Sequence, residues 1–183
     1  MPGLDRVRLA WERVDPLNRR ATSRRLLRML DPALTQIRSG PCPRCGGAHG
    51  RPTAPGRDTV ISVTYAGGFA IVAVLPAAAG ASLGVDAQAG LSDGPAAMDR
   101  VRPGTTVREW TRIEAALKAD GRGLAVDPGR VRLEDQPGGW RAIVPDRSSP
   151  ILGVDANGPE GLVVSLAMIP AAAAAGTDDR ATA

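Results

Sequence analysis

One well-marked helix stands out in a sequence that glycines and prolines otherwise divide into short runs. Thr106 and Glu109 form the S/T-x-x-E pattern of a capping box, and Gly121 stands where a C-cap glycine is expected. The apolar residues between them recur every three or four positions and form a single stripe. The sequence therefore predicts a capped, amphipathic helix over residues 107–120.

The other apolar runs are short and typical of β-strands. Residues 59–64 and 69–75 are separated by Ala-Gly-Gly at 66–68, which predicts a β-hairpin. Residues 83–86 are expected to form a short buried strand that ends at Asp86. Four further strands are expected between glycine-rich turns, at residues 131–133, 140–144, 151–154 and 162–167. This mixture of strands and helix predicts an α+β fold.

The rest of the chain is expected to be less regular. Arg24–Leu30 has the spacing of an amphipathic helix, with Asp31-Pro32 as its stop. Residues 39–58 and 89–105 contain several glycines and prolines, which predicts loops. Residues 171–183 are an alanine tract followed by polar residues, and we expect this tail to be frayed.

Composition narrows the classes of protein to consider. Of 183 residues, 43% are hydrophobic and 23% are charged, which favours a soluble chain with a packed core. No apolar run reaches the roughly 20 residues of a membrane span, and no secretory signal follows Met1. We therefore expect a cytoplasmic protein with no membrane partner, in which Cys42 and Cys45 stay reduced.

Basic charge is concentrated in residues 1–40, which hold nine arginines against four acidic residues. This excess suits nucleic acid, an acidic protein or a phosphorylated small molecule, and its sign does not choose among them. Lys118 is the only lysine among 23 basic residues, which suggests a position where a compact ammonium is needed. Glu114 precedes it by one helical turn. An ordinary ion pair at this spacing, worth about 0.3–0.5 kcal/mol, is the simpler interpretation of these two residues.

Four motifs follow one another along the chain: HGRP at 49–52, SVTYAGG at 62–68, GVDAQ at 84–88 and WTRIEAALKADGRGL at 110–124. Over about residues 40–133, this succession resembles the 4'-phosphopantetheinyl transferases of the larger, two-lobed type. That family has a G-[KR]-P turn, an N-[IV]-S-H-S-G-like strand, a G-[IV]-D-x-E strand and a W-T-x-K-E-A-x-x-K-x-x-G-x-G-L helix. The helix motif matches at Trp110, Thr111, Glu114, Ala115, Lys118, Gly121, Gly123 and Leu124.

The resemblance implies transfer of 4'-phosphopantetheine from coenzyme A to a serine of an acyl or peptidyl carrier protein, with Mg²⁺. The metal ligands would be Asp86, Gln88 and Glu114, since Mg²⁺ prefers one or two carboxylates with phosphate oxygens and water. Glu114 would also accept the serine proton, and Lys118 would stabilise the departing 3',5'-ADP at the pyrophosphate.

Coenzyme A phosphates would be bound mainly by arginines. Arg51 matches the cation of the G-[KR]-P turn, and Arg24 and Arg28 are expected at the 3'-phosphate. Tyr65 stands where the family has a histidine, and its hydroxyl can donate a hydrogen bond to a phosphate.

Four positions depart from the family pattern: Gln88 replaces a glutamate, Tyr65 a histidine, Ser62 an asparagine and Ile113 a lysine. Gln88 removes one negative charge from the metal site, although its amide oxygen can hold a water or ligate weakly. These changes leave a second interpretation open, in which a degenerate relative binds coenzyme A or a carrier protein without catalysing transfer.

The resemblance also implies two pseudo-symmetric lobes, each a small antiparallel sheet packed on a long helix. Residues 1–82 would form the N-terminal lobe with the basic helix and the CxxC turn, and residues 83–170 the C-terminal lobe with the metal site. Residues 171–183 would be a flexible tail, and the protein would be a monomer.

Three features have competing explanations. The arginine-rich N-terminus and the CPRCG turn would also suit a nucleic-acid-binding module. With only five aromatic residues and no recognition motif, we expect no nucleic-acid partner.

Half of a zinc ribbon is suggested by Cys42, Cys45 and His49. A closed zinc site needs four ligands, so we expect reduced thiols instead. Asp155 lies in a second Leu-Gly-Val-Asp-Ala segment, just before the hairpin signal Asn157-Gly158, and is expected in a turn.

Overall fold

The computed structural model describes residues 1, 3–15, 17–42, 45–48, 50–90 and 103–171. This part of the chain is α+β, as predicted, with strands predominating over two α-helices. Most of the predicted 89–105 loop, most of the predicted tail and His49 lie outside the described residues. None of the described helices is long and apolar enough to cross a membrane.

A three-stranded antiparallel sheet has the order β1-β5-β4, formed by Arg8–Arg13, Phe69–Pro76 and Thr59–Ala66. β4 and β5 are the predicted hairpin, and both glycines of its turn have positive φ angles that suit glycine. Helix α1 (Arg19–Leu30) packs on β1 and β5 and ends just before Asp31, the predicted stop. Strand β1 was not predicted, and α1 begins five residues before the predicted Arg24.

A five-stranded antiparallel sheet has the order β6-β10-β9-β8-β7. Its strands are β6 (Gly80–Ala89), β7 (Arg132–Gln136), β8 (Gly139–Ile143), β9 (Ile151–Ala156) and β10 (Leu162–Pro170). The four strands predicted after the helix are therefore confirmed, with ends shifted by a few residues. β6 is longer than the predicted strand and extends beyond Asp86.

Helix α3 spans Val107–Asp120, the predicted range. The capping box of Thr106 and Glu109 is formed, and Gly121 closes the helix with a φ of 89°. α3 packs on β6 and β10. A Cβ atom on Gly84 of β6 would lie only 2.0 Å from a backbone oxygen of the helix, so this close approach requires glycine.

The predicted 39–58 loop contains a minimal two-stranded ladder, and short 3₁₀ turns punctuate the rest of the chain. These elements are β2 (Arg38–Ser39), β3 (Pro52–Thr53), η1 (Leu4–Arg6), η2 (Gly123–Ala125) and η3 (Pro128–Arg130). β3 directly follows Arg51, so the ladder fixes the position of the expected phosphate-binding turn.

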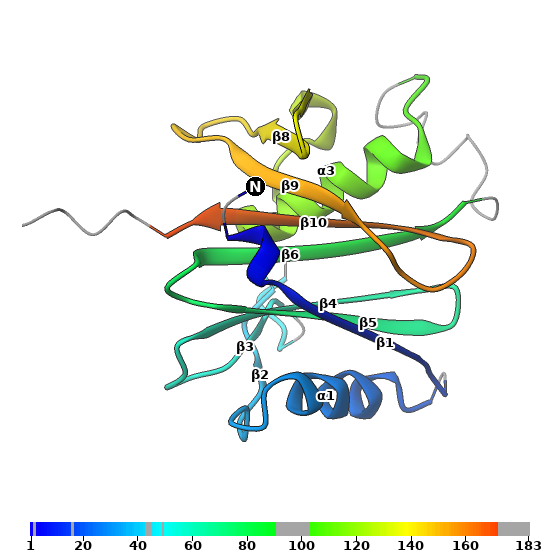
Figure 1. Ribbon diagram of the computed structural model, residues 1–183, viewed down its shortest axis with the longest axis vertical. Coiled ribbons are helices and arrows are strands. Elements are labelled where there is room, and N and C mark those ends of the chain that lie inside the picture. Colours follow the sequence, from blue (N-terminus) through cyan, green and yellow to red (C-terminus); the bar gives the residue numbers. More distant parts are fainter. Residues whose placement is uncertain (2, 16, 43–44, 49, 91–102, 172–183) are drawn as a thin grey trace, which may run out of the picture.

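Strand β4 of the three-stranded sheet lies beside β6 of the five-stranded sheet. In Figure 1, α1 lies at the bottom of the molecule and α3 in its upper part, with β4, β5 and β6 between them. A buried apolar cluster joins the sheets, with Leu75 from β5, Leu83 from β6 and Met168 from β10 among its members. The division expected after residue 82 thus falls within β6 and within a shared core.

Candidate functional site

Asp86 lies at the centre of the candidate site. It is 1% exposed and occupies the interior of β6, so the expectation that the strand ends there is wrong. β6 continues to Ala89 because its last residues pair with β10. Asp86 Oδ1 accepts hydrogen bonds from Lys118 Nζ at 2.6 Å and from Thr64 Oγ1 at 3.1 Å. Two sheets and a helix therefore meet at one buried carboxylate.

Lys118 and Glu114 lie one turn apart on the face of α3 directed at β6, as the spacing predicts. Lys118 Nζ donates to Asp86 and also, at 3.1 Å each, to Thr64 Oγ1 and the Val85 carbonyl. An ammonium has three N–H donors, and three acceptors receive them here. This compact arrangement is what a guanidinium could not reproduce.

Gln88 completes the cluster with its amide nitrogen. Nε2 donates to Asp86 Oδ2 at 3.1 Å and to Glu114 Oε2 at 2.9 Å. The sequence had suggested that the amide oxygen would face a metal ion. In the structure the donor end of the amide faces both carboxylates instead.

The cluster holds two carboxyl groups, Asp86 and Glu114, and one ammonium, Lys118. Burial, followed by the charge of Asp86, raises the pKa of Glu114 from 4.5 to about 8. The Lys118 charge and the Gln88 hydrogen bond oppose this rise without cancelling it. One ammonium is thus shared by two carboxyl groups, and Glu114 keeps its proton near neutral pH.

These residues surround a cavity of about 400 Å³ between β4, β6 and α3. Its lining includes Thr64, Tyr65, Asp86, Gln88, Glu114 and Lys118. The predicted metal ligands and catalytic residues are therefore brought together. Among the described residues, no cluster of three or more His, Cys, Asp or Glu side chains could hold a metal ion. The donors available here are two carboxylates and one amide.

Tyr65 connects this cavity to a second one, of about 600 Å³, beside α1. Its hydroxyl is 2.7 Å from Ser23 Oγ, and the Arg19 guanidinium lies 5.2 Å from its ring centre. Arg19, Arg20 and Arg24 line the second cavity. Arg24, which was predicted at the 3'-phosphate, therefore lines this second cavity with two arginines that the sequence did not single out.

Arg28 lies elsewhere. It is not among the lining residues of the second cavity, and its Nε donates to the Leu34 carbonyl at 3.3 Å. The register of α1 thus directs Arg19, Arg20 and Arg24 towards Tyr65, and Arg28 towards the segment after the helix.

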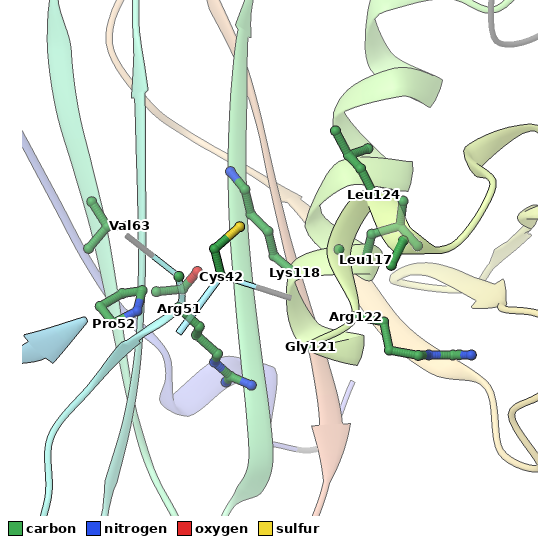
Figure 2. Close-up of a pocket in the computed structure, with 13 residues that line it drawn as sticks. Cys42, Arg51, Pro52, Val63, Leu117, Lys118, Gly121, Arg122 and Leu124 are labelled. Atoms are coloured by element: carbon green, nitrogen blue, oxygen red, sulfur yellow. The ribbon is translucent and has the colours of Figure 1, made fainter. Parts of the chain in front are cut away.

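Arg51 and Lys118 share a third cavity of about 760 Å³ (Figure 2). Figure 2 shows their charged groups pointing in opposite directions and the Arg122 side chain pointing away from both. Arg51 donates to the Leu83 carbonyl at 3.3 Å, and burial lowers the pKa of its guanidinium. Cys42 also lines this cavity, whereas Cys45 is exposed.

The most important residue that the sequence did not single out is Thr64, which is 6% exposed and links β4 to Asp86 and Lys118. Ser62, two residues earlier on the same strand, accepts a hydrogen bond from the Val85 amide at 2.9 Å. Alternating polar residues in an otherwise apolar strand were the available signal. Ile113, at the position where the family has lysine, is 1% exposed in the α3 core.

Asp155 is not in a turn, contrary to expectation. It lies in β9, where Arg112 donates to both of its carboxylate oxygens, at 3.0 and 2.7 Å. Ser165 of β10 donates to Oδ1 at 3.0 Å. The second Leu-Gly-Val-Asp-Ala segment is therefore a strand with a fully paired aspartate.

Comparisons with known proteins assign none of these residues. No protein-family model matches the chain, and no curated protein matches it significantly. The functional argument therefore depends on the geometry of the site and on the ordered motifs.

Proposed function

We propose that this protein transfers the 4'-phosphopantetheine group from coenzyme A to a serine of an acyl or peptidyl carrier protein. The observation that carries the proposal is the convergence of Asp86, Glu114 and Lys118 on one cavity at the junction of two sheets. These are the residues that the resembled family's strand and helix motifs single out.

In this reaction the serine oxygen attacks the β-phosphorus of the pyrophosphate, and the bond to 3',5'-ADP breaks. Glu114 accepts the serine proton. With a pKa of about 8, Glu114 is mostly protonated at neutral pH, and its ionised fraction, which grows as pH rises, is a stronger base than an ordinary glutamate. Lys118 faces the same cavity and stabilises the negative charge that develops on the leaving group.

Mg²⁺ fits this site because two carboxyl groups, Asp86 and Glu114, line one cavity, and Mg²⁺ prefers one or two carboxylates with phosphate oxygens and water. These two carboxylates would hold the ion, with Gln88 beside them. When bound, the ion neutralises charge on the pyrophosphate oxygens.

The arginine-lined cavities supply the phosphate contacts of the proposal. Arg24, with Arg19 and Arg20, suits the 3'-phosphate, and Arg51 suits the pyrophosphate side of the ligand. Arg28 was predicted for the same role, and its bond to the Leu34 carbonyl makes it the weaker candidate.

The finer architecture belongs to the same proposal. Two related lobes, the three-stranded sheet with α1 and the five-stranded sheet with α3, would bind the nucleotide between them. A monomer acting in the cytoplasm would meet carrier proteins, which are usually acidic. The basic N-terminal residues would attract them, and the groove beside α3 is the proposed docking face.

Intact mass spectrometry tests the transfer directly. Apo acyl and apo peptidyl carrier proteins are each incubated with the full chain, coenzyme A and Mg²⁺. We expect a carrier serine to gain the mass of one phosphopantetheine arm, and the Glu114→Gln variant to give none. If neither carrier gains mass although the wild-type protein binds coenzyme A, the transferase proposal is wrong.

One observation favours a second candidate, a protein that binds coenzyme A without transferring from it. Gln88 already donates a hydrogen bond to both carboxyl groups that would hold the metal ion. Calorimetric titration with coenzyme A distinguishes the candidates when combined with the mass assay. Tight binding without carrier modification supports this second candidate.

A further inference from the structure

The contact between Gln88 and the two carboxylates has a consequence for how a cation enters the site. Both amide N–H groups are used, one on Asp86 Oδ2 and one on Glu114 Oε2. A carboxyl oxygen that carries no hydrogen can only accept, and Asp86 Oδ2 and Glu114 Oε2 both accept from Nε2, so the amide turns its nitrogen towards them. This orientation follows from the chemistry of the neighbours.

The amide nitrogen lies where the two carboxylates converge. A cation that ligated Asp86 through Oδ2 and Glu114 through Oε2 would use the two oxygens that now accept from Gln88. Asp86 Oδ1 is already bonded to Lys118 and Thr64, and its Oδ2 to Gln88. A divalent ion that uses Oδ2 and the Glu114 oxygen therefore competes directly with the Gln88 nitrogen.

We propose that Gln88 is a stand-in for the cation rather than a ligand of it. A divalent ion binds by displacing the amide from both carboxylates, and two carboxylates alone then hold it weakly. Phosphate oxygens of the substrate complete its coordination, so the ion binds tightly only together with coenzyme A. This last step rests on the proposed function, whereas the competition between amide and ion does not.

The side chain has room for this exchange, because Gln88 is only partly buried near the exposed end of β6. Replacing it changes the site in two separable ways. Gln88→Ala removes the competitor and leaves two carboxylates. Gln88→Glu adds a third carboxylate, which raises the affinity of an oxygen site for divalent ions by about tenfold or more.

Titration of the full-length protein with Mn²⁺, followed by electron paramagnetic resonance, tests the proposal without any carrier protein. We expect Gln88→Ala to bind Mn²⁺ at least as tightly as wild type, Gln88→Glu about tenfold more tightly, and Glu114→Gln more weakly. If Gln88→Ala binds Mn²⁺ more weakly, then Gln88 is a ligand and the proposal is overturned. Absence of Mn²⁺ binding in every variant also overturns it.

Thermal unfolding gives a second test of Mn²⁺ binding. Each variant is compared with itself, with and without Mn²⁺, so differences in stability between variants do not affect the result. Gln88→Ala should unfold at a lower temperature than wild type without metal, because the carboxylates lose their shared donor, and Mn²⁺ should restore more of its stability. A smaller Mn²⁺ effect than in wild type contradicts the proposal.

Coenzyme A separates this inference from the transferase proposal. We expect coenzyme A to tighten Mn²⁺ binding by wild type. If Gln88→Ala behaves as expected but coenzyme A has no effect, the amide is a cation stand-in and the proposed function fails. If coenzyme A tightens Mn²⁺ binding but Gln88→Ala weakens it, the inference about Gln88 fails and the proposed function stands.

Discussion

The same five residues, Leu-Gly-Val-Asp-Ala, occur at 83–87 in β6 and at 152–156 in β9, and these two strands flank β10. Both segments pair with β10 in the same register, so that Asp86 and Asp155 both lie opposite Ser165. Residues at matching positions of adjacent strands project to the same face of a sheet. Each aspartate bonds to a cation of α3, Lys118 in one case and Arg112 in the other.

The two aspartates differ in how their charge is balanced. Asp155 accepts two hydrogen bonds from Arg112 and one from Ser165, and Arg108 adds an ion pair at 3.6 Å. Burial alone would raise the pKa of Asp155, but the bonds and charge of Arg112 outweigh it and hold the pKa below its usual value. This pair is a closed structural contact.

Asp86 has the opposite setting although its strand is locally identical. Its cation is the smaller Lys118, and Glu114 adds a second carboxyl group whose pKa rises to about 8. The residue that α3 presents to each aspartate therefore decides how the charge of that aspartate is balanced. A bidentate arginine closes one position, and an ammonium shared with a glutamate leaves the other short of positive charge.

Alanine substitution of each aspartate should give the largest contrast. Asp86→Ala should lower transfer by about a hundredfold or more, because the site loses a carboxylate and the partner of Lys118. Asp155→Ala should lower the melting temperature and leave transfer per folded molecule nearly unchanged. Mass spectrometry of a carrier protein measures transfer by both variants. Near-normal transfer by Asp86→Ala would contradict the site assignment.

Exchange of the two cations should give a smaller contrast. Lys118→Arg should lower transfer by about tenfold, since a hydrogen bond to a charged group is worth about 1.5–3 kcal/mol and a guanidinium cannot meet all three acceptors. Arg112→Lys should instead reduce stability, because one of its two bonds to Asp155 is lost. Equal loss of activity in both variants would contradict the comparison.

Thr64 should have a smaller effect again, because it acts on the site through Asp86 and Lys118. Thr64→Val keeps the shape of the side chain and removes the hydroxyl, which should cost about 1–2 kcal/mol of stability and lower kcat with little change in KM. Thr64→Ser should restore both. A serine variant as impaired as the valine variant would show that packing, not the hydroxyl, is what matters.

Much of this arrangement follows from local sequence, and the rest depends on contacts between distant residues. The ends of α3 were predictable because its capping box and Gly121 act within one turn. The end of β6 was mispredicted because pairing with β10, more than seventy residues later, extends the strand past Asp86. β1 was missed because pairing with β5 orders its arginine-rich residues.

The candidate site also has a part that local sequence predicts and a part that depends on contacts between distant residues. The spacing of Glu114 and Lys118 placed them on one face, and the motif order brought Asp86 to them. The alternation of polar residues in β4 could have drawn attention to Thr64 but not to its partners, which lie on the other sheet and on α3. The position of Asp155 was mispredicted because the turn signal that follows it says nothing of Arg112, 43 residues away.

The free energy of unfolding should depend on pH in opposite ways at Glu114, beside Asp86, and at Asp155. Glu114 has a folded-state pKa of about 8 against 4.5, so the folded protein holds an extra proton between these values and loses stability as pH rises through them. Glu114→Gln removes this loss, and its free energy of unfolding at pH 9 should exceed that of wild type by on the order of 2 kcal/mol, with a smaller difference at pH 5. Asp155 has a lowered folded-state pKa, so its contribution is present at neutral pH and is lost as pH falls through the acid range. Asp155→Asn should therefore be less stable than wild type at pH 7, and the gap should close on acidification. Calorimetry from pH 3 to 9 measures both curves, and parallel curves for the two variants would contradict the opposite pKa shifts of Glu114 and Asp155.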